Sequence, residues 1–402
     1  MAVITPRCIT TPLEASAPVA RTALAIADAN WFTTENLFHE IERDDVATLL
    51  LSCIDYRNAW NRGLPPWSWG KRLRATGAGE WRREHVLPSG WMKRFPRLGM
   101  RPIARTIRGW WREHVPDSRL ALVMTYPHYL YLRDMVRPDR SIYYNLDDYR
   151  ICWPNAAKAL AELEHRAVRE SDATVCVSRL RAEELRAAVP EASGRIHHLP
   201  HGAPRWSIGD QPFHQPADVP ADLDHLPRPL LGYVGSVEGR VDWALMTRVS
   251  EAFPDASLVV VGRVPDRSKS QAPWVEGWER FRARPNVHAI GWRSQDMIAQ
   301  YNRAFDVCLI PYLLDHPFNQ ACSPTKIMDC MGTGRPVVST GIPECRLYEH
   351  LFHVADDQAF IKAIQSVLDQ GSDDGRAGLR YEWARANTCA ATASRLLDLI
   401  PY

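Results

Sequence analysis

The sequence predicts an α/β fold built from two doubly wound units, each with a parallel β-sheet. Short apolar runs typical of buried strands alternate with segments whose apolar residues recur every three to four positions, as in helices. The alternation stops in a proline-rich stretch at 206–228, which we interpret as a linker, and then resumes. The chain has 402 residues, more than the roughly 100–200 of one ordinary domain. Two units account for this length.

The first unit is expected over residues 1–205. Its alternating pattern begins with a strand, a helix and a strand, and continues with three more short apolar strands and one long amphipathic helix. The predicted strands are 22–28, 47–53, 119–124, 141–146 and 173–178, and the predicted helices are 35–45 and 155–171.

The second unit is expected over residues 229–375, where strand and helix again alternate with short turns. The predicted strands are 229–235, 256–262, 287–292, 305–312 and 335–340, and the predicted helices are 244–253, 294–304 and 324–332. A last helix within 376–402 follows the final strand, and we expect it to pack back on the first unit.

Composition excludes several classes of protein. Hydrophobic residues make up 46% and charged residues 24%, which is typical of a globular chain. There is no apolar run near the roughly 20 residues that a membrane span needs, and Met1 to Ala20 lacks the pattern of a secretion signal. None of the nine cysteines forms a Cys-x-x-Cys pair, which argues against a zinc or iron–sulfur site. An odd number of unpaired cysteines is typical of a protein in the reducing cytoplasm.

Several segments resemble the GT-B fold of nucleotide-sugar glycosyltransferases, particularly those of bacterial exopolysaccharide and envelope assembly. They are EHRAVRESDATVCVSRLRAEEL, IHHLPHGAP, LLGYVGSVEGRVDW, PNVHAIGWRSQDMIAQYNRAFDVCLIPY and SPTKIMDCMGTGRPVVST. Together they cover about residues 140–390. The resemblance implies two Rossmann-like units facing across a cleft, with the acceptor on the first and a nucleoside diphosphate sugar, of the UDP or GDP type, on the second.

The second unit contains a candidate site for the donor diphosphate. Ser323, Thr325 and Lys326 lie where a helix begins after Pro324, so a capping hydroxyl, free N–H groups and one cation could meet the phosphates. Such a site needs no metal and no further cofactor. The resemblance implies that Asp329 binds the ribose hydroxyls; a helix ion pair with Lys326 is the alternative.

Two loops complete the predicted donor site. Gly235, Ser236 and Arg240 follow the first strand of the second unit, where a sheet of this type binds its ligand. The segment GYVGSVEG does not fit Gly-x-Gly-x-x-Gly, which disfavours a nicotinamide dehydrogenase. Gly291 and Trp292 end another strand, where family members hold the base, although Trp292 could instead belong to the core.

The candidate catalytic base lies in the first unit. Asp147 and Asp148 follow an apolar strand, and because adjacent side chains of extended backbone point to opposite sides, only one is expected to face the acceptor. We assign this role to Asp148, whose position resembles an aspartate of inverting exopolysaccharide enzymes; a helix or turn cap is the alternative. His128 is the rival base. Many retaining members carry a glutamate at the positions of Ala321 and Asp329, so the stereochemistry stays open.

Residues 57–115 are strongly basic and rich in tryptophan. They contain fourteen Arg or Lys against three Glu, and seven of the fifteen tryptophans. Such a segment suits the anionic inner face of the cell membrane, where lipid-linked glycans are built. Nucleic acid would attract the same charges, but the resemblance favours the membrane, and helices with solvated basic faces are the neutral interpretation.

The sequence therefore predicts a cytoplasmic, peripheral membrane glycosyltransferase that acts on a lipid-linked or other glycan acceptor, with no nucleic-acid partner. Two alternatives stay open. One is a nucleotide-sugar epimerase of the same fold, and the other is a GT-B subunit that binds without turnover.

Overall fold

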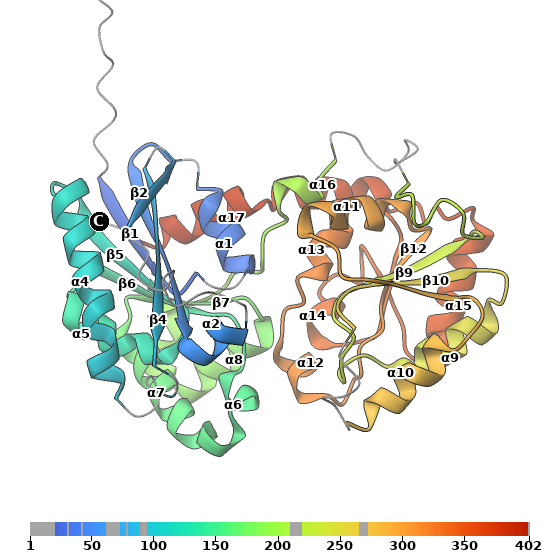
Figure 1. The fold of residues 1–402 in the computed structure, drawn as a ribbon, viewed down its shortest axis with the longest axis horizontal. Helices are drawn as coiled ribbons and strands as arrows, with labels where there is room; N and C mark the ends of the chain where they lie inside the picture. Colours follow the sequence, from blue (N-terminus) through green and yellow to red (C-terminus); the bar gives the residue numbers. More distant parts are fainter. Residues whose placement is uncertain are drawn as a thin grey trace, which may run out of the picture.

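The computed structural model describes residues 21–29, 32–41, 43–61, 73–77, 79–88, 90, 95–209, 219–264 and 272–400. These residues form two α/β units that lie side by side (Figure 1). Each unit has its own parallel sheet and its own hydrophobic core, as the two-unit prediction requires. The predicted fold class is therefore confirmed.

The N-terminal unit contains an eight-stranded sheet in the order β3-β4-β2-β1-β5-β6-β7-β8. Its strands are β1 (Thr22–Ala27), β2 (Val46–Asp55), β3 (Arg74–Gly77), β4 (Glu80–Leu87), β5 (Arg119–Met124), β6 (Arg140–Asn145), β7 (Ala173–Cys176) and β8 (Ile196–His198). All pairs are parallel except β3 with β4. Every residue of β1 is buried, which explains its unbroken apolar sequence, because helices cover both faces there.

Helices cover the two faces of this sheet. They are α1 (Phe32–His39), α2 (Tyr56–Asn61), α4 (Pro96–His114), α5 (Leu130–Val136), α6 (Tyr149–Cys152), α7 (Ala157–Glu170) and α8 (Arg179–Ala188). On one face α4 and α5 pack on β1, β2 and β5. On the other face α1 packs beside α17 (Cys389–Asp398), which comes from the end of the chain.

The C-terminal unit contains a six-stranded parallel sheet in the order β11-β10-β9-β12-β13-β14. The strands are β9 (Leu230–Val234), β10 (Ser257–Val261), β11 (Val287–Gly291), β12 (Val307–Ile310), β13 (Val337–Ser339) and β14 (His353–Val354). Its helices are α9 (Trp243–Ala252), α10 (Trp274–Arg282), α11 (Gln295–Ala304), α12 (Pro317–Ala321), α13 (Lys326–Met331), α14 (Pro343–Arg346), α15 (Asp357–Asp369) and α16 (Ala377–Ala386).

The chain crosses between the units twice, and the two crossings touch. Ala203 forms a bridge with Thr388, and a Cβ on Gly202 would lie 2.6 Å from the backbone of Cys389. After this point α17 returns to the N-terminal sheet, where Ala393 and Leu396 are buried. The two crossings thus form a tight double hinge.

The basic segment, residues 57–115, is not purely helical, as the interpretation of solvated basic helices would require, because it also contributes two strands. β3 and β4 extend the sheet, and α4 follows them. Three of its tryptophans belong to the core: Trp110 is buried, Trp81 meets it edge to face at 5.8 Å between ring centroids, and Trp111 packs on the same cluster. Trp60 is exposed. Trp67, Trp69 and Trp91 lie outside the described residues.

Candidate active site

The carboxyl ends of β6 and β9 face each other across the two units. Asp147 follows β6 and Arg240 follows β9, and the two side chains are close enough for their charges to interact. In open α/β sheets the ligand binds beyond the carboxyl ends of the strands. This meeting of the two units therefore defines the candidate active site.

Lys326, the first residue of α13, is buried rather than exposed. Its Nζ lies 4.2 Å from the ring centroid of Tyr233 and 4.4 Å from that of Tyr312. Burial and the positive charge of Arg240 lower the pKa of Lys326 to about 7. Lys326 has no ion pair with an acidic residue in the described part of the chain, and the expected alternative, an ion pair with Asp329, does not form.

The glycine loop after β9 packs tightly on this lysine. A Cβ on Gly235, whose φ is +152°, would lie 2.7 Å from Lys326 Nζ. A Cβ on Gly262 would lie 1.9 Å from the carbonyl oxygen of Gly235. Ser236 is exposed, and its carbonyl accepts a hydrogen bond from the Tyr233 hydroxyl at 3.0 Å. The two glycines therefore let the loop approach Lys326 closely.

Arg240 is held in place by its surroundings. Its guanidinium lies over the rings of Tyr312 and Phe318, 4.8 and 5.0 Å from their centroids, and its Nε donates to Glu238 Oε1 at 2.5 Å. Asn319 donates to the Arg240 carbonyl at 2.9 Å. The side chain is thus fixed beside Lys326 before any ligand binds, and the two cations share one site.

The start of α13 differs in detail from the expected cap. The Ser323 hydroxyl donates to Glu344 Oε1 at 3.3 Å, and Thr325 occupies the N-cap position without a side-chain hydrogen bond. Glu344 is buried and also accepts from the backbone N–H of Arg179 at 3.3 Å, so it joins the two units. Glu344 was not predicted from the sequence, because nothing in its neighbourhood distinguishes it from a helix-end glutamate.

Asp148 occupies the position that the sequence analysis gave as the alternative, a helix cap. It accepts from the backbone N–H of Arg150 at 3.0 Å and from its guanidinium Nε at 2.7 Å. Burial opposes ionisation of Asp148, but these bonds and the charge of Arg181 outweigh it and hold the pKa below its usual range. A carboxylate bound in this way is a weak base.

Asp147 has the opposite environment. Burial raises the pKa of Asp147 to about 7, although the charge of Arg240 acts against this shift. Its carboxylate has no hydrogen-bond partner in the described part of the chain. Of the two aspartates, Asp147 is therefore the one that has a free carboxylate and a pKa suited to proton transfer near neutrality.

A buried ionic network supports the loop that follows β6 and carries Asp147 and Asp148. Arg181 donates to Glu164 at 2.8 Å, and Glu164 also accepts from Tyr143 and Asn145, each at 2.8 Å. Asn145 in turn donates to the carbonyl of Asp147 at 3.0 Å. These bonds fix the backbone at the end of β6. His128, the rival base, is half-buried in a 3₁₀ turn directly after β5.

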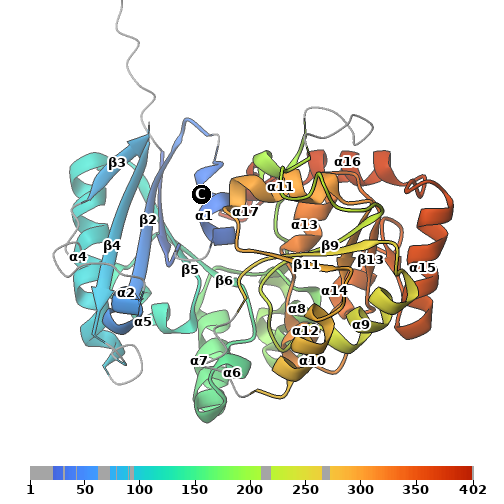
Figure 2. The same ribbon diagram turned by 45° about the vertical axis from the view of Figure 1, so that its right-hand side comes forward.

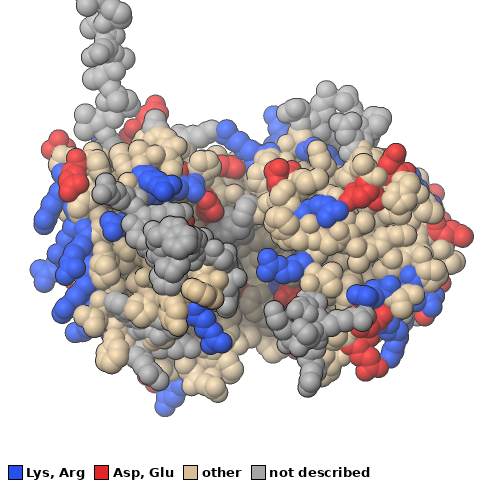
Figure 3. All heavy atoms as spheres, viewed as in Figure 1, with Lys and Arg blue, Asp and Glu red and all other residues tan. Residues whose placement is uncertain are grey.

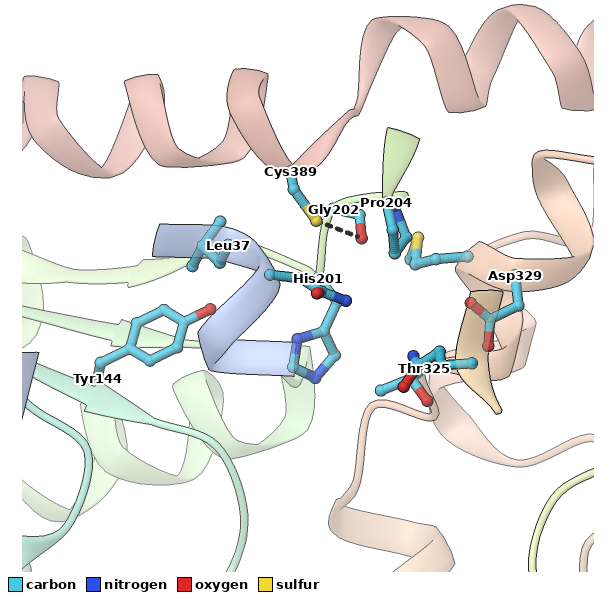
Figure 4. Close-up of a pocket in the computed structure, with 11 residues that line it drawn as sticks. Leu37, Tyr144, His201, Gly202, Pro204, Thr325, Asp329 and Cys389 are labelled. Atoms are coloured by element: carbon cyan, nitrogen blue, oxygen red, sulfur yellow. Dashed lines mark hydrogen bonds between the residues drawn. The ribbon is translucent and has the colours of Figure 1, made fainter. Parts of the chain in front are cut away.

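A pocket between the two units carries Asp329. Figure 4 shows His201 between Tyr144 of the N-terminal unit and Thr325 and Asp329 of the C-terminal unit. Burial raises the pKa of Asp329 to about 7 and lowers that of His201 to about 4. Neither side chain has a hydrogen-bond partner in the described residues. Sequence reasoning missed His201, although it lies within the quoted segment IHHLPHGAP.

The last predicted pair lies at the end of β11. Gly291 has a φ of +83°, and the ring of Trp292 is 64% exposed, so it does not belong to the core. Arg293 next to it donates to Asp222 at 2.6 Å and to Tyr301 at 2.8 Å. In the described residues no cluster of three or more His, Cys, Asp or Glu could hold a metal ion.

Two facing Rossmann-like units, a double hinge and a cationic site at the carboxyl ends of the strands define the GT-B class. Residues 228–370 match the model of the family described as glycosyl transferases group 1. The chain therefore has the GT-B fold, and its second unit is similar to the group 1 glycosyltransferases over the matched residues.

A comparison with a known protein is consistent with this resemblance. A protein of Bacillus subtilis (strain 168), described as "Putative teichuronic acid biosynthesis glycosyltransferase TuaH", is 24% identical over 238 residues, which is 57% of this chain and 56% of that protein. The match thus spans little more than half of that relative.

Solved structures show the same fold. Sucrose-phosphate synthase of Thermosynechococcus elongatus has a TM-score of 0.66 at 14% identity, covering 94% of this chain and 98% of that chain. HepE of Anabaena, solved in complex with UDP and glucose, has a TM-score of 0.64 at 12% identity, with the same coverage.

Proposed function

We propose that this protein transfers a sugar from a uridine diphosphate sugar to a glycan acceptor that is held at an anionic membrane surface. The observation that carries the proposal is the pair of fixed cations, Lys326 and Arg240, opposite the unpaired carboxylate of Asp147. The UDP bound to HepE supports uridine as the base.

The two cations supply the charge that the reaction needs. Breaking the bond between the sugar and the diphosphate leaves negative charge on the diphosphate, and preorganised cations in a buried site stabilise it strongly. Arg240 can pair with phosphate oxygens through two N–H groups, and Lys326 acts as a point charge. This scheme invokes no metal ion and no cofactor besides the donor itself.

Asp147 takes the proton of the acceptor hydroxyl in this scheme. Its carboxylate is unpaired and near Arg240, so the hydroxyl would be activated close to the diphosphate. Asp148 holds the start of α6 instead. We therefore assign the base to Asp147 and keep His128 as the rival that the experiment below separates.

The nucleoside would lie beside the small pocket between the units, whose own volume of about 20 Å³ is too small to enclose it. Asp329 can accept hydrogen bonds from both ribose hydroxyls once it is ionised, and Trp292 offers an exposed ring to the base. Thr325 lines the same pocket. Asp329 and Thr325 belong to the second unit, and His201 to the hinge, so a bound nucleoside would contact both.

Helix α4 supports the membrane part of the proposal. Arg101, Arg105, Arg108 and Arg112 follow one another at helical spacing, all are exposed, and none has an ion pair in the described residues. Figure 3 shows basic side chains gathered along the edge of the molecule where α4 lies. Each basic residue near an anionic surface contributes about 1 kcal/mol. None of the described helices is long and apolar enough to span a bilayer.

Calorimetric titration with UDP, GDP and their sugars, followed by product analysis, tests the proposed function. We expect tighter binding of UDP than of GDP, and sugar transfer to a membrane extract. Binding without turnover would indicate the non-catalytic subunit, and a changed sugar on the same nucleotide would indicate the epimerase. Absence of nucleotide binding would overturn the proposal.

A further inference from the structure

One half of the N-terminal sheet has a polar face, which is unusual for a mostly parallel sheet. Over β1, β5 and β6 the face toward α1 is apolar and is covered by α1 and α17. Over β4 and β3 the same face carries charged and hydroxyl side chains instead, and β2 adds the Ser52 hydroxyl beside the apolar Leu50. Figure 2 shows these three strands extending beyond α1. Because parallel sheets normally bury both faces, the polar half calls for an explanation by function.

The register places these polar side chains together. Ser52 of β2 pairs with Glu84 of β4, and Arg82 of β4 pairs with Arg74 of β3. Thr76 of β3 reaches the same face, because its hydroxyl donates to Glu80 Oε1 at 2.5 Å. The face thus alternates guanidinium, carboxylate and hydroxyl groups across three strands.

Arg82 is anchored from several sides. Its Nε donates to Glu80 Oε1 at 2.8 Å, and its guanidinium also pairs with Glu35 of α1. His39 of α1 lies 2.8 Å from Glu80 Oε2. Arg82 and Glu35 are therefore held in fixed orientations, although about a third to a half of each side chain is exposed.

These residues line a cavity of about 260 Å³. Its walls include Glu35, Ser52, Arg74, Arg82 and Glu84, and its apolar floor includes Ala29 and Leu50. Arg74 is exposed and has no hydrogen bond or ion pair in the described residues. The volume is close to the roughly 300 Å³ at which small-molecule sites begin.

We propose that this cavity is a second glycan site that binds one pyranose unit of the acceptor, away from the reacting hydroxyl. Fixed carboxylates accept hydrogen bonds from adjacent sugar hydroxyls, and guanidinium groups donate to them, so neighbouring groups of both kinds suit a polyhydroxylated ring. The apolar floor at Ala29 and Leu50 can take the C–H face of the ring.

The distance to the active site fits an extended acceptor. β2 and β6 are three strand positions apart in the sheet, which corresponds to about 14 Å. This is more than one sugar ring spans, so a unit in the cavity would precede the one that reacts at Asp147. The inference rests on the proposed function, because it assumes that the acceptor is a glycan.

Saturation-transfer difference NMR on the full chain tests the site. The probes are the methyl pyranosides of glucose, galactose, mannose, N-acetylglucosamine and glucuronic acid, each added in the presence of saturating UDP. We expect at least one to give a signal, and Arg74→Glu and Arg82→Gln to weaken its affinity about tenfold. Arg82→Gln removes ion pairs, so thermal melting checks that this variant is folded. Arg74→Glu removes no side-chain hydrogen bond or ion pair among the described residues, so it tests the site even if Arg82→Gln is unstable.

Arg137→Glu is the matched control, because Arg137 is exposed at the end of α5, at the opposite end of β6 from Asp147. Its signal should equal that of the wild type. No signal from any pyranoside, or a signal that both cavity variants keep, would overturn the inference. A signal lost in Lys326→Met alone would place the sugar in the donor site and also overturn it. UDP affinity is measured separately, so failure of the proposed function is recognised independently.

Discussion

Lys326 Nζ lies 4.2 Å from the ring centroid of Tyr233, where its charge faces two aromatic rings and Arg240; Glu238 acts on it only at longer range, without an ion pair in the described residues. Burial and Arg240 lower its pKa to about 7. A diphosphate bound at this position would supply the missing negative charge and would raise the pKa of Lys326 again. Donor binding and protonation of Lys326 are therefore linked.

The first prediction concerns the pH dependence of UDP binding. Above about pH 7 the free protein has a neutral Lys326, so UDP binding must take up a proton, and the affinity should fall as the pH rises from 7 to 9. Calorimetry at pH 8 in two buffers with different ionisation enthalpies measures this uptake. We expect close to one proton per UDP in the wild type and much less in Lys326→Met, which should also bind UDP at least tenfold more weakly. Equal proton uptake in both proteins would contradict this assignment.

A second prediction uses the same group as a stability probe. The pKa of Lys326 is lower in the folded than in the unfolded chain, so between about pH 7 and 10 the unfolded state binds more protons at this position, and rising pH favours folding. Lys326→Met removes this contribution. The melting temperature of the wild type relative to the variant should therefore increase with pH across this range. A constant difference between the two proteins would show that Lys326 titrates normally.

The third prediction separates the two aspartates. Asp147→Asn should reduce kcat by about 10² or more, the scale for loss of a general base, while UDP affinity stays within about threefold. Asp148→Asn keeps an oxygen that can cap α6 but removes the negative charge that pairs with Arg150 and Arg181, so it should lower stability by about 1–2 kcal/mol and affect kcat much less. Chemical denaturation and steady-state kinetics measure the two effects. If Asp147→Asn is active and His128→Ala is not, the base is His128.

The pH profile gives an independent check of the same roles. In the free protein Asp147 must be ionised and Lys326 protonated, and both have a pKa of about 7. The profile of kcat/KM should therefore be a narrow bell centred near pH 7. In the donor complex the diphosphate holds Lys326 protonated, so the profile of kcat should keep only the rising limb. A broad plateau in kcat/KM between pH 6 and 9 would argue against these assignments.

Much of the fold could be predicted because the buried strands of both cores are visible in the sequence as apolar runs. β1, β5 and β10 are continuous apolar runs, as strands buried on both faces must be. β3 and β4 could not be found in this way. Their exposed and half-buried residues include Arg74, Arg82 and Glu84, so they show no apolar run, and only the pairing of β4 with β2 and of β3 with β4 makes them strands.

The site was harder to predict than the fold, because side-chain direction depends on where a helix begins. α6 starts at Tyr149, which makes Asp148 its N-cap and leaves Asp147 unpaired near Arg240. No pattern in YYNLDDY distinguishes the two. His201 and Glu344 were missed for a related reason: each acquires its role from the opposite unit, through the pocket or the bond to Arg179.

The last prediction concerns the arginine face of α4, formed by Arg101, Arg105, Arg108 and Arg112. The wild type should sediment with anionic vesicles at low salt and much less at 0.5 M salt, where the Debye length falls to a few ångströms. Replacing all four arginines with Gln should remove most of this binding, while UDP affinity stays unchanged. The control replaces four arginines of the C-terminal unit, namely the half-buried Arg248 and the exposed Arg280, Arg282 and Arg385. It loses the same charge, so equal loss of binding in both variants would mean that net charge alone attracts the protein. DNA bound as tightly as anionic vesicles at the same salt would show that the face does not select membranes.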